Sequence, residues 1–285
     1  MIALVYSGSR NADWKLADKG QIIAEFKTPG INPYFIDKKH ILQLLHKRTE
    51  LINNAEKIKK IYFFGAGVSL NERKEIISDA LSQFFKFSKI YVDNDLQAAA
   101  VATCNQMPGI TGIIGSGSNA GYFDGRKVKS NNFGLGYILG DEGSANWLGR
   151  QILKHFLYEK LPLQFEQNFL KKYDTNRKEI LDKIYKQTQP ALYLSSFADF
   201  LLENNKEPYV KDLIFDGFNL FIETYLYPLK KQYPEVPIYI VGTVVYNFNS
   251  WFLESAKNHD LTITGIVKEP IYNLLKHYLN RASQA

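Results

Sequence analysis

Short apolar runs and turn signals alternate at the start of the chain. Ile2–Tyr6 is a β-type run. Asp13–Ala17 and Gln21–Phe26 flank Asp18-Lys19-Gly20, a combination that predicts a hairpin. The pattern therefore predicts three antiparallel strands at the N-terminus.

Helical and strand patterns then alternate. Apolar residues at helical spacing predict a helix over Ile36–Asn53. Strands are expected at Ile61–Phe64 and Lys89–Val92, with helices at Asn71–Phe85 and Asp95–Cys104. A β-meander followed by β-α-β-α units indicates an α/β architecture.

A second β pattern begins after Pro108-Gly109. Ile110–Ile114 is predicted as a strand, and Ala120–Phe123 and Lys127–Lys129 flank the hairpin signal Asp124-Gly125. The elements expected after this hairpin are a helix from Gly143 to about Tyr158, helices over 164–232, a strand at Ile238–Val241, a helix near 246–257, a strand at Leu261–Thr264 and a last helix from Pro270. This order suggests two related α/β lobes with a boundary near residue 108 and a cleft between them.

Composition narrows the class of protein. The chain has 285 residues, of which 45% are apolar and 22% charged, as in ordinary globular proteins. Its single cysteine, Cys104, excludes an intrachain disulfide and a thiolate-rich metal site. The start lacks a basic segment, and the longest apolar stretch, Ile238–Tyr246, is too short to span a membrane. We therefore expect a cytoplasmic protein that does not act on membranes.

The net charge of +6 comes mostly from the N-terminal sixty residues, which hold eleven basic and six acidic residues. The basic residues of the segment 38–60 alternate with Leu and Ile at helical spacing. This pattern favours a solvated helix face, and a phosphate-rich partner is the alternative. A basic chain permits nucleic-acid binding without arguing for it, and we expect none.

A run of small residues, Gly115–Ala120, follows a predicted strand. It fits the loose dinucleotide fingerprint, which requires a helix from about Ser118, whereas the pattern here predicts a hairpin. A Gly-Ser-Gly-Ser turn can also cradle phosphate, because small residues let backbone N–H groups approach the oxygens. The alternative is a plain β-turn. The chain has no P-loop pattern.

Two acidic segments are candidates for chemistry. Asp95 lies between a predicted strand and an alanine-rich helix, where it could be the N-cap or a general base for a substrate hydroxyl. A calcium loop is excluded because Gln97 and Ala98 stand where a ligand and a glycine belong. In Gly140–Ser144, Asp141 or Ser144 could cap the next helix, and Asp141 could also accept hydrogen bonds from ligand hydroxyls. The histidines show no metal-ligand spacing.

Several of these pieces occur together in an order typical of one family. They are Ser7-Gly8-Ser9, Asp13-Trp14, Gly30-Ile31-Asn32-Pro33, Gly65-Ala66-Gly67, Asp95, Ile114–Asn119, Gly134-Leu135-Gly136, Gly140–Ser144 and Gly242-Thr243-Val244. Over nearly its whole length the chain resembles the N-acetylglucosamine kinases and the related BadF/BadG/BcrA/BcrD ATPases, which share the actin, hexokinase and chaperone ATPase fold.

The resemblance implies an α/β, two-lobed actin-like (ribonuclease H-like) fold in which each lobe is a mixed sheet with flanking helices. Residues 1–108 would form the N-terminal lobe, completed by the C-terminal helix 270–285, and residues 109–269 the other lobe. ATP and an amino sugar would bind in the cleft, as cofactor and substrate. The resemblance leaves a homodimer open.

The resemblance also implies roles for individual residues. Asp95 would be the catalytic base. The residues implied in nucleotide binding are Ser7, Gly8, Ser9, Arg10, Asn11, Gly115, Ser116, Gly117, Ser118, Gly242 and Thr243. Those implied in sugar binding are Asn32, Asn119, Gly136 and Asp141.

The first phosphate loop departs from the family pattern Asp-x-Gly-x-Thr-Lys-Thr. Tyr6 stands where the acidic residue would hold hydrated Mg²⁺, and Arg10 and Asn11 replace Thr and Lys. Two explanations remain open at this point. Either Arg10 neutralises phosphate directly in a working kinase, or the protein is a pseudokinase that binds sugar and acts as a sensor or partner.

Overall fold

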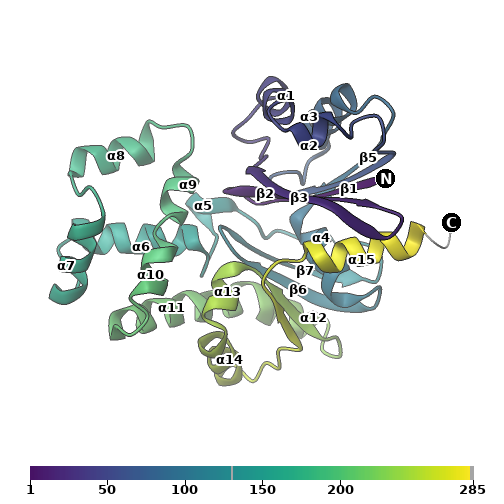
Figure 1. The fold of residues 1–285 in the computed structure, drawn as a ribbon. Helices are drawn as coiled ribbons and strands as arrows, with labels where there is room; N and C mark the ends of the chain where they lie inside the picture. The colour runs from purple at the N-terminus through teal and green to yellow at the C-terminus, as the bar shows by residue number, and fades with distance from the viewer. Residues whose placement is uncertain (130, 283–285) are drawn as a thin grey trace. The chain divides into compact units, whose positions relative to one another are not determined.

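The computed structural model describes residues 1–129 and 131–282, and the chain divides into two compact units (Figure 1). Unit 1 combines Met1–Met107, Gly125–Lys127 and the segment that begins at Glu269. Unit 2 combines Pro108–Asp124 and Val128–Lys268. Each unit has its own β-sheet and its own apolar core.

Unit 1 is built on a five-stranded sheet of order β3-β2-β1-β4-β5. The strands are β1 (Ile2–Ser7), β2 (Asn11–Asp18), β3 (Gln21–Pro29), β4 (Lys60–Gly65) and β5 (Lys89–Asn94). The first three are antiparallel, whereas β1, β4 and β5 run parallel. The predicted N-terminal meander is confirmed.

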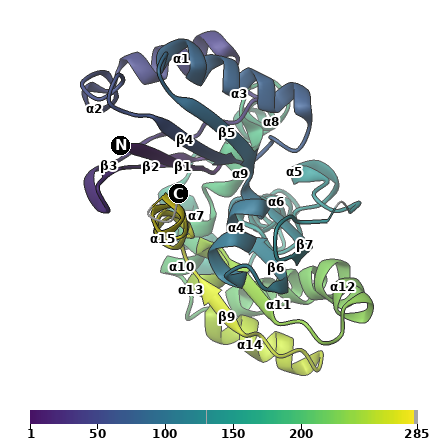
Figure 2. The same ribbon diagram turned by 90° about the vertical axis from the view of Figure 1, so that its right-hand side faces the viewer.

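Helices cover both faces of this sheet (Figure 2). They are α1 (Lys38–His46), α2 (Thr49–Ile52) and α3 (Asn71–Phe84) on one face, and α4 (Asp95–Cys104) and α15 (Ile271–Ala282) on the other. Because strand side chains alternate, Ala3 and Val5 join the α1/α3 core, whereas Ile2 and Leu4 join the core with α4 and α15.

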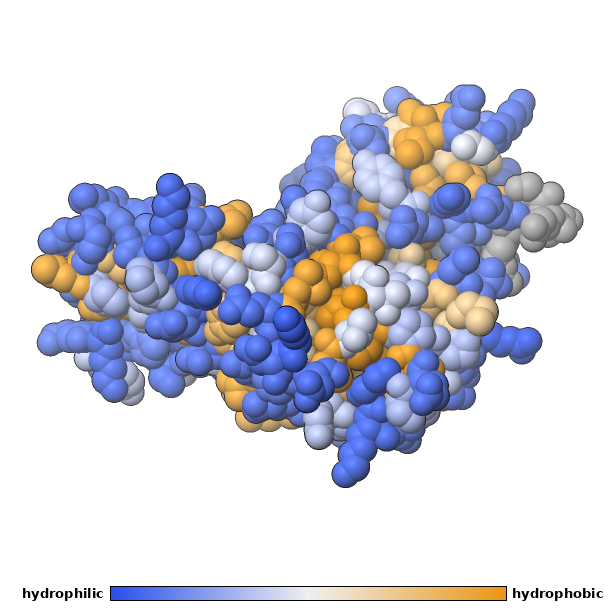
Figure 3. Space-filling model, turned by 90° about the horizontal axis from the view of Figure 1, so that it is seen from below, coloured by the Kyte–Doolittle hydropathy of each residue, from blue (hydrophilic) through white to orange (hydrophobic). Residues whose placement is uncertain are grey.

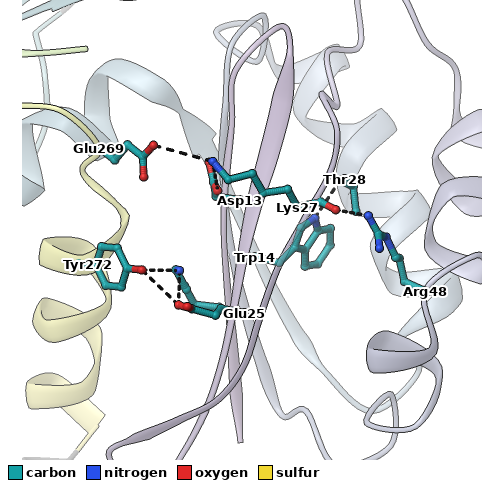
Figure 4. A network of polar contacts seen from close by, with 9 residues as sticks. Asp13, Trp14, Glu25, Lys27, Thr28, Arg48, Glu269 and Tyr272 are labelled. Carbon is teal, nitrogen blue, oxygen red and sulfur yellow. Dashed lines mark hydrogen bonds and ion pairs between the residues drawn. The ribbon is translucent and has the colours of Figure 1, made fainter. Parts of the chain in front are cut away.

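Polar contacts join the C-terminal segment to the N-terminal sheet (Figure 4). The Tyr272 hydroxyl accepts a hydrogen bond from Lys15 Nζ at 2.9 Å. Lys27 Nζ lies 3.1 Å from the Asp13 carboxylate and 3.8 Å from that of Glu269. Residues from the two ends of the chain therefore complete one unit.

The single helix expected over 36–53 is wrong, because α1 ends at His46 and the four-residue α2 begins at Thr49. Arg48 between them has extended backbone angles, and its guanidinium donates to the Lys27 carbonyl. The apolar spacing continues across the break because Leu45 and Leu51 both join the same core.

Unit 2 has a four-stranded sheet of order β7-β6-β8-β9. The strands are β6 (Pro108–Ile114), β7 (Ser118–Asp124), β8 (Ile238–Val241) and β9 (Gly265–Val267). The β6–β7 pair is antiparallel, and β6, β8 and β9 are parallel. The expected strand at 261–264 is wrong, because the residues opposite β8 are 265–267. The expected return strand at 127–129 is reduced to one bridge between Phe123 and Val128.

The helices of unit 2 pack around an aromatic-rich core. They are α5 (Gly136–Leu139), α6 (Ala145–Leu157), α7 (Leu163–Lys172), α8 (Arg177–Tyr185), α9 (Pro190–Ser195), α10 (Ala198–Glu203), α11 (Pro208–Phe221), the π-helix η1 (Ile222–Leu226), α12 (Tyr227–Gln232), α13 (Thr243–Asn247) and α14 (Asn249–Asn258). The helix expected near 246–257 is therefore two helices, α13 and α14.

The surface is charged, and the two units differ in charge. Unit 1 has nineteen basic and twelve acidic residues, whereas unit 2 has sixteen basic and seventeen acidic residues.

The basic residues of α1 line a groove with Gln43 and Gln83. On the face in Figure 3, hydrophilic side chains surround a hydrophobic patch near the centre of the view. Among the described residues, no helix combines the length and apolar character that a membrane crossing needs.

Candidate active site

Three parallel strands of unit 1 bring candidate residues to one edge of the sheet. In the register, Ser7 lies opposite Gly65, and Gly65 lies opposite Asn94. Asp95 follows immediately. The carboxyl edge of parallel strands is where α/β proteins bind ligands. The sheet therefore brings Ser7 and Gly8 to the same edge as Asp95, which is far from them in sequence.

Asp95 is the first residue of α4 and is partly exposed. The cap of this helix is Asn94, whose Oδ1 accepts the Gln97 N–H at 2.8 Å. The interpretation of Asp95 as the N-cap is therefore wrong. Its Oδ1 accepts the adjacent Leu96 N–H at 2.9 Å. A carboxylate at a helix N-terminus is stabilised by the helix dipole.

Tyr6 lies on the face of the sheet that α4 covers, with Phe64 and Ala98 in the same cluster. Burial is the largest cause that raises the pKa of the Tyr6 hydroxyl, and the charges of Asp95 and Asp13 raise it further. The phenol therefore stays neutral at physiological pH. It also lies close enough to both carboxylates for their negative charges to disfavour its ionisation.

Backbone hydrogen bonds within the turn and from Gly30 fix the first turn, Gly8–Arg10. Gly8 N donates to Asn11 O at 2.9 Å, and Gly30 N donates to Arg10 O at 3.1 Å. A Cβ on Gly30 would lie 2.4 Å from the Gly8 carbonyl oxygen, so only glycine fits there. The buried Ser7 hydroxyl accepts the Ile31 N–H at 2.8 Å. This backbone arrangement leaves Ser9 and Arg10 partly exposed and Asn11 exposed.

Asn32 is 8% exposed and lies beside the turn that ends β4. Its Oδ1 accepts the Tyr34 N–H at 3.0 Å. Gly67 has φ +80°, and a Cβ there would lie 2.3 Å from the same oxygen. Asn32 is therefore fixed in unit 1, two residues beyond the segment that backs the first turn.

The second turn, Gly115–Gly117, belongs to unit 2 and joins β6 to β7. Gly115 N donates to Gly117 O at 3.0 Å. The first N–H groups of α6 point at this turn, because Ala145 N donates to Gly115 O at 2.9 Å and Asn146 N to Ser116 O at 3.0 Å. Ser118 begins a strand rather than a helix, which excludes the dinucleotide fingerprint.

Asp141 is 6% exposed and faces the second turn. Its Oδ1 accepts the Ser118 N–H at 3.0 Å, and its Oδ2 accepts Asn146 Nδ2 at 3.2 Å. Burial, the largest cause, raises the pKa of the Asp141 carboxyl, although both hydrogen bonds lower it. A Cβ on Gly117 would lie 2.9 Å from Oδ2, so the turn and the carboxylate fit closely. Ser144, and not Asp141, caps α6.

The other unit 2 candidates surround the same turn. Gly242, with φ +137°, ends β8, and a Cβ there would lie 3.0 Å from Gly115 N. Thr243 is exposed at the start of α13. The Asn119 side chain packs against Gly134, where a Cβ would lie 2.8 Å from Nδ2. Gly136 starts α5 at φ +78°, with open space around it.

Comparison with known proteins shows the family of this chain. No family model matches the chain. The solved structure of a "putative N-acetylglucosamine kinase" from Porphyromonas gingivalis is 31% identical, and the match covers 99% of this chain and 100% of that chain with a TM-score of 0.90. This chain belongs to the N-acetylglucosamine kinase family. The resemblance seen in the sequence and the two-lobed actin-like fold class are confirmed.

Two further comparisons are weaker. The N-acetylmuramic acid/N-acetylglucosamine kinase of Clostridium acetobutylicum is 32% identical over 120 residues, so the match spans 41% of this chain and 39% of that protein. A ROK family glucokinase from Streptomyces griseus, solved with glucose and AMPPNP, is 13% identical with a TM-score of 0.61. At that identity the likeness shows the fold alone.

The family pattern places a magnesium-binding carboxylate at position 6, and the residues present do not fit one. Tyr6 offers a neutral phenol. Asp13, the carboxylate opposite Tyr6 in the sheet, is paired with Lys27. Among the described residues, no group of three or more His, Cys, Asp or Glu side chains could hold a metal. In the described part of the chain, position 6 therefore offers a neutral phenol and no carboxylate to a magnesium ion.

Two residues of this family member were missed by the sequence analysis. Asn146 is 3% exposed, and its Oδ1 has no hydrogen-bond partner within the described part of the chain. Tyr225 donates its hydroxyl hydrogen to Glu142 Oε2. Asn146 stands between Ala145 and Trp147, which are both buried, and a polar residue in such a place indicates a buried polar side chain. No local pattern marks Tyr225.

Proposed function

We propose that this protein transfers the γ-phosphoryl group of ATP to a hydroxyl of N-acetylglucosamine or a closely related amino sugar, and that its two units are the two lobes of this kinase. Family membership supports the reaction class. The observation that carries the proposal for this chain is Asp95, a carboxylate at the carboxyl edge of β1, β4 and β5 that is not used as a helix cap.

Asp95 acts as the general base in this proposal. Its carboxylate takes the proton of the sugar hydroxyl while the hydroxyl oxygen forms a bond to the γ-phosphorus. The bond between that phosphorus and the β–γ bridging oxygen breaks, and ADP leaves with the electron pair. Phosphoryl transfer depends mainly on positioning and charge neutralisation, so proton removal supplies one part of the rate, typically 10²–10⁴-fold.

The turns bind the nucleotide. The proposed phosphate contacts are the first turn with its flanks, Ser7–Asn11, and the second turn, Gly115–Ser118. Both turns are fixed by backbone hydrogen bonds to neighbouring segments. Arg10 supplies positive charge at the first turn, where no carboxylate of the family pattern holds a metal. Gly242 and Thr243 contact the adenosine, which agrees with the position of Gly242 against Gly115.

Four residues are proposed to bind the sugar. Asn32 lies in unit 1, and Asn119, Gly136 and Asp141 lie in unit 2. Asp141 has one hydrogen-bond donor on each carboxylate oxygen, which leaves lone pairs for ligand hydroxyls. The neighbouring Asn146 Oδ1 is a buried acceptor that a ligand N–H or O–H can satisfy.

The direct test measures ADP release from purified protein and MgATP, with N-acetylglucosamine, N-acetylmannosamine, glucosamine and glucose in parallel. We expect sugar-dependent ADP release, strongest with an N-acetylated sugar. Equal release with and without every sugar would contradict the proposal.

A pseudokinase is the second candidate, favoured by one observation, the tyrosine at position 6. In that case sugar raises the melting temperature while MgATP does not, because only a ligand that binds the folded state stabilises it. A strong shift with MgATP together with turnover excludes the pseudokinase.

A further inference from the structure

A π-helix places one tyrosine against the loop that holds Asp141. Residues 222–226 form η1 between α11 and α12. π-helical turns inside α-helices are rare and frequently occur at functional sites. Tyr225, in this turn, is 2% exposed, and its ring lies edge-on to Phe133 at 5.1 Å between centroids. Phe133 belongs to the loop that leads to Gly134 and α5.

The Tyr225 hydroxyl is bonded to the residue that follows Asp141 and lies near the residue that precedes it. It donates to Glu142 Oε2. It also lies against Gly140, where a Cβ would be 3.4 Å from the hydroxyl oxygen. Burial, followed by the hydrogen bond to Glu142, raises the pKa of the Tyr225 hydroxyl, so the group remains a donor throughout the physiological range.

The loop needs such an anchor because its backbone is strained. Asp141 has φ +63° and Gly143 has φ +73°. A left-handed aspartate is uncommon, and strained residues of this kind persist only where the surroundings hold them. Gly143 is held by Gly217, whose carbonyl oxygen would lie 2.6 Å from an added Cβ. On the other side, Arg150 of α6 donates to Ile138 O at 2.8 Å.

We propose that Tyr225 is a positioning residue: through Glu142 and Gly140 it keeps the 140–143 loop in the conformation that aims Asp141 at the second turn and at the sugar. The part that concerns sugar rests on the proposed function. Tyr225 itself is not assigned a contact with substrate.

The first experiment compares Tyr225→Phe with Tyr209→Phe. Tyr209 is the matched control, because it is a partly buried tyrosine of the adjoining α11 whose hydroxyl lies 2.7 Å from His155 Nδ1, away from the loop. We expect Tyr225→Phe to raise the Kd for N-acetylglucosamine and its KM roughly tenfold, since a hydrogen bond to a charged group is lost. Tyr209→Phe leaves both sugar constants within twofold.

Hydrogen exchange of the peptide covering residues 134–143 gives a readout that needs no ligand. We expect faster exchange in Tyr225→Phe and wild-type exchange in Tyr209→Phe. Unchanged loop exchange together with an unchanged sugar Kd would overturn the proposal, even if Tyr225→Phe lowers the melting temperature. If wild-type protein neither binds nor phosphorylates any sugar, the proposed function fails, and the exchange comparison alone decides the role of Tyr225.

A double-mutant cycle tests the route through Glu142. Glu142→Ala should match Tyr225→Phe, and the double variant should lose no more than either single variant. Glu142→Gln keeps an oxygen that accepts the tyrosine hydrogen bond and should restore loop exchange to within threefold of wild type. Additive losses would overturn the proposed route, because they would mean that the two side chains act separately.

Discussion

The two units contain the same hairpin in two chemical versions. In unit 1 the strand order β2-β1-β4-β5 starts from the β1–β2 hairpin, and in unit 2 the order β7-β6-β8-β9 starts from the β6–β7 hairpin. In both sheets the first strand pairs antiparallel with the second and parallel with a later strand. Each hairpin has one turn between its two strands, and these two turns are the candidate phosphate loops.

The turns differ in what supports them. The second turn is supported by the N-terminus of α6 and by Asp141, which accepts the Ser118 N–H. The first turn is backed by the backbone around Gly30, while the side chains at positions 6, 10 and 11 have changed. Because main-chain hydrogen bonds build both hairpins, side chains at the first turn can change without altering the fold. The fold is therefore the same whether or not the side chains of the first turn support phosphoryl transfer.

Asp95→Asn separates the roles of the two units and should have the largest effect. The amide has nearly the same shape but cannot take the hydroxyl proton, so we expect kcat to fall about 10²–10⁴-fold. The Kd for sugar, measured by calorimetry, should stay within about threefold. A variant with wild-type sugar-dependent ADP release would remove Asp95 from the mechanism.

Rebuilding the first turn tests whether its changed side chains limit the rate. The triple variant Tyr6→Asp, Arg10→Thr and Asn11→Lys restores the family pattern. Because a metal contact contributes several kcal/mol and about 1.4 kcal/mol is tenfold in rate, we expect kcat to rise at least roughly tenfold. Binding of ATP, measured by calorimetry, should become more dependent on Mg²⁺.

Arg10→Ala alone is the control for the triple variant. It removes charge without restoring a metal ligand, so ATP binding should weaken. If the triple variant folds with the wild-type melting temperature and gains no activity, the first turn is not the element that limits catalysis.

Adding a methyl group to each turn compares their packing. In Gly117→Ala the new Cβ would lie 2.9 Å from Asp141 Oδ2, whereas in Gly8→Ala the nearest contact is Asn11 O at 3.7 Å. We expect Gly117→Ala to lower the free energy of unfolding by about 1–3 kcal/mol. Gly8→Ala should change it by less than about 0.5 kcal/mol. Urea denaturation measures both, and equal losses would contradict the closer fit of the second turn.

Asp141→Asn should have the smallest effect on stability, and one that depends on pH. Burial in the folded state raises the pKa of the Asp141 carboxyl above its ordinary value of 3.8, so the folded state binds this proton more tightly than the unfolded state. The wild type therefore loses stability as pH rises from 3.8 through the folded pKa. The variant lacks this loss, because an amide does not bind or release a proton in this range.

Melting temperatures from pH 3 to pH 7 check this prediction. The difference between Asp141→Asn and wild type should be near zero at the acidic end and should shift in favour of the variant toward neutrality. The variant should nevertheless bind N-acetylglucosamine more weakly than wild type. A difference that is independent of pH would show that burial of the charge is not the cause.

Local patterns predicted much of the architecture. Turn chemistry at Asp18-Lys19-Gly20 located the β2–β3 hairpin, and the Gly-Ser-Gly-Ser run at Gly115–Ser118 is a turn between two strands, as expected. Ser144 was one of two expected caps for the helix that begins at Ala145. The carboxyl end of a predicted strand marked Asp95 as a candidate, whereas Ser7 was a candidate through the family resemblance. These predictions succeed because turns, caps and strand ends depend on a few consecutive residues.

Predictions failed where a distant segment decided the outcome. Arg48 interrupts the expected long helix while it bonds to the carbonyl of Lys27. The last strand begins at Gly265 because only that residue and its successors lie opposite β8. Asn94 rather than Asp95 caps α4, and two adjacent cap-forming residues cannot be distinguished from sequence alone.

The amino-acid sequence by itself determined the family, the two hairpins, and the identity of the acidic residues at positions 95 and 141. Only the tertiary structure decided that Asn146 and Asp141 share a buried hydrogen bond and that Tyr225 holds the loop around Asp141 from 83 residues away. The physical reason is that periodicity and turn chemistry act between near neighbours. A hydrogen bond between distant side chains exists only after the core has packed and a π-helical turn has set the direction of one tyrosine.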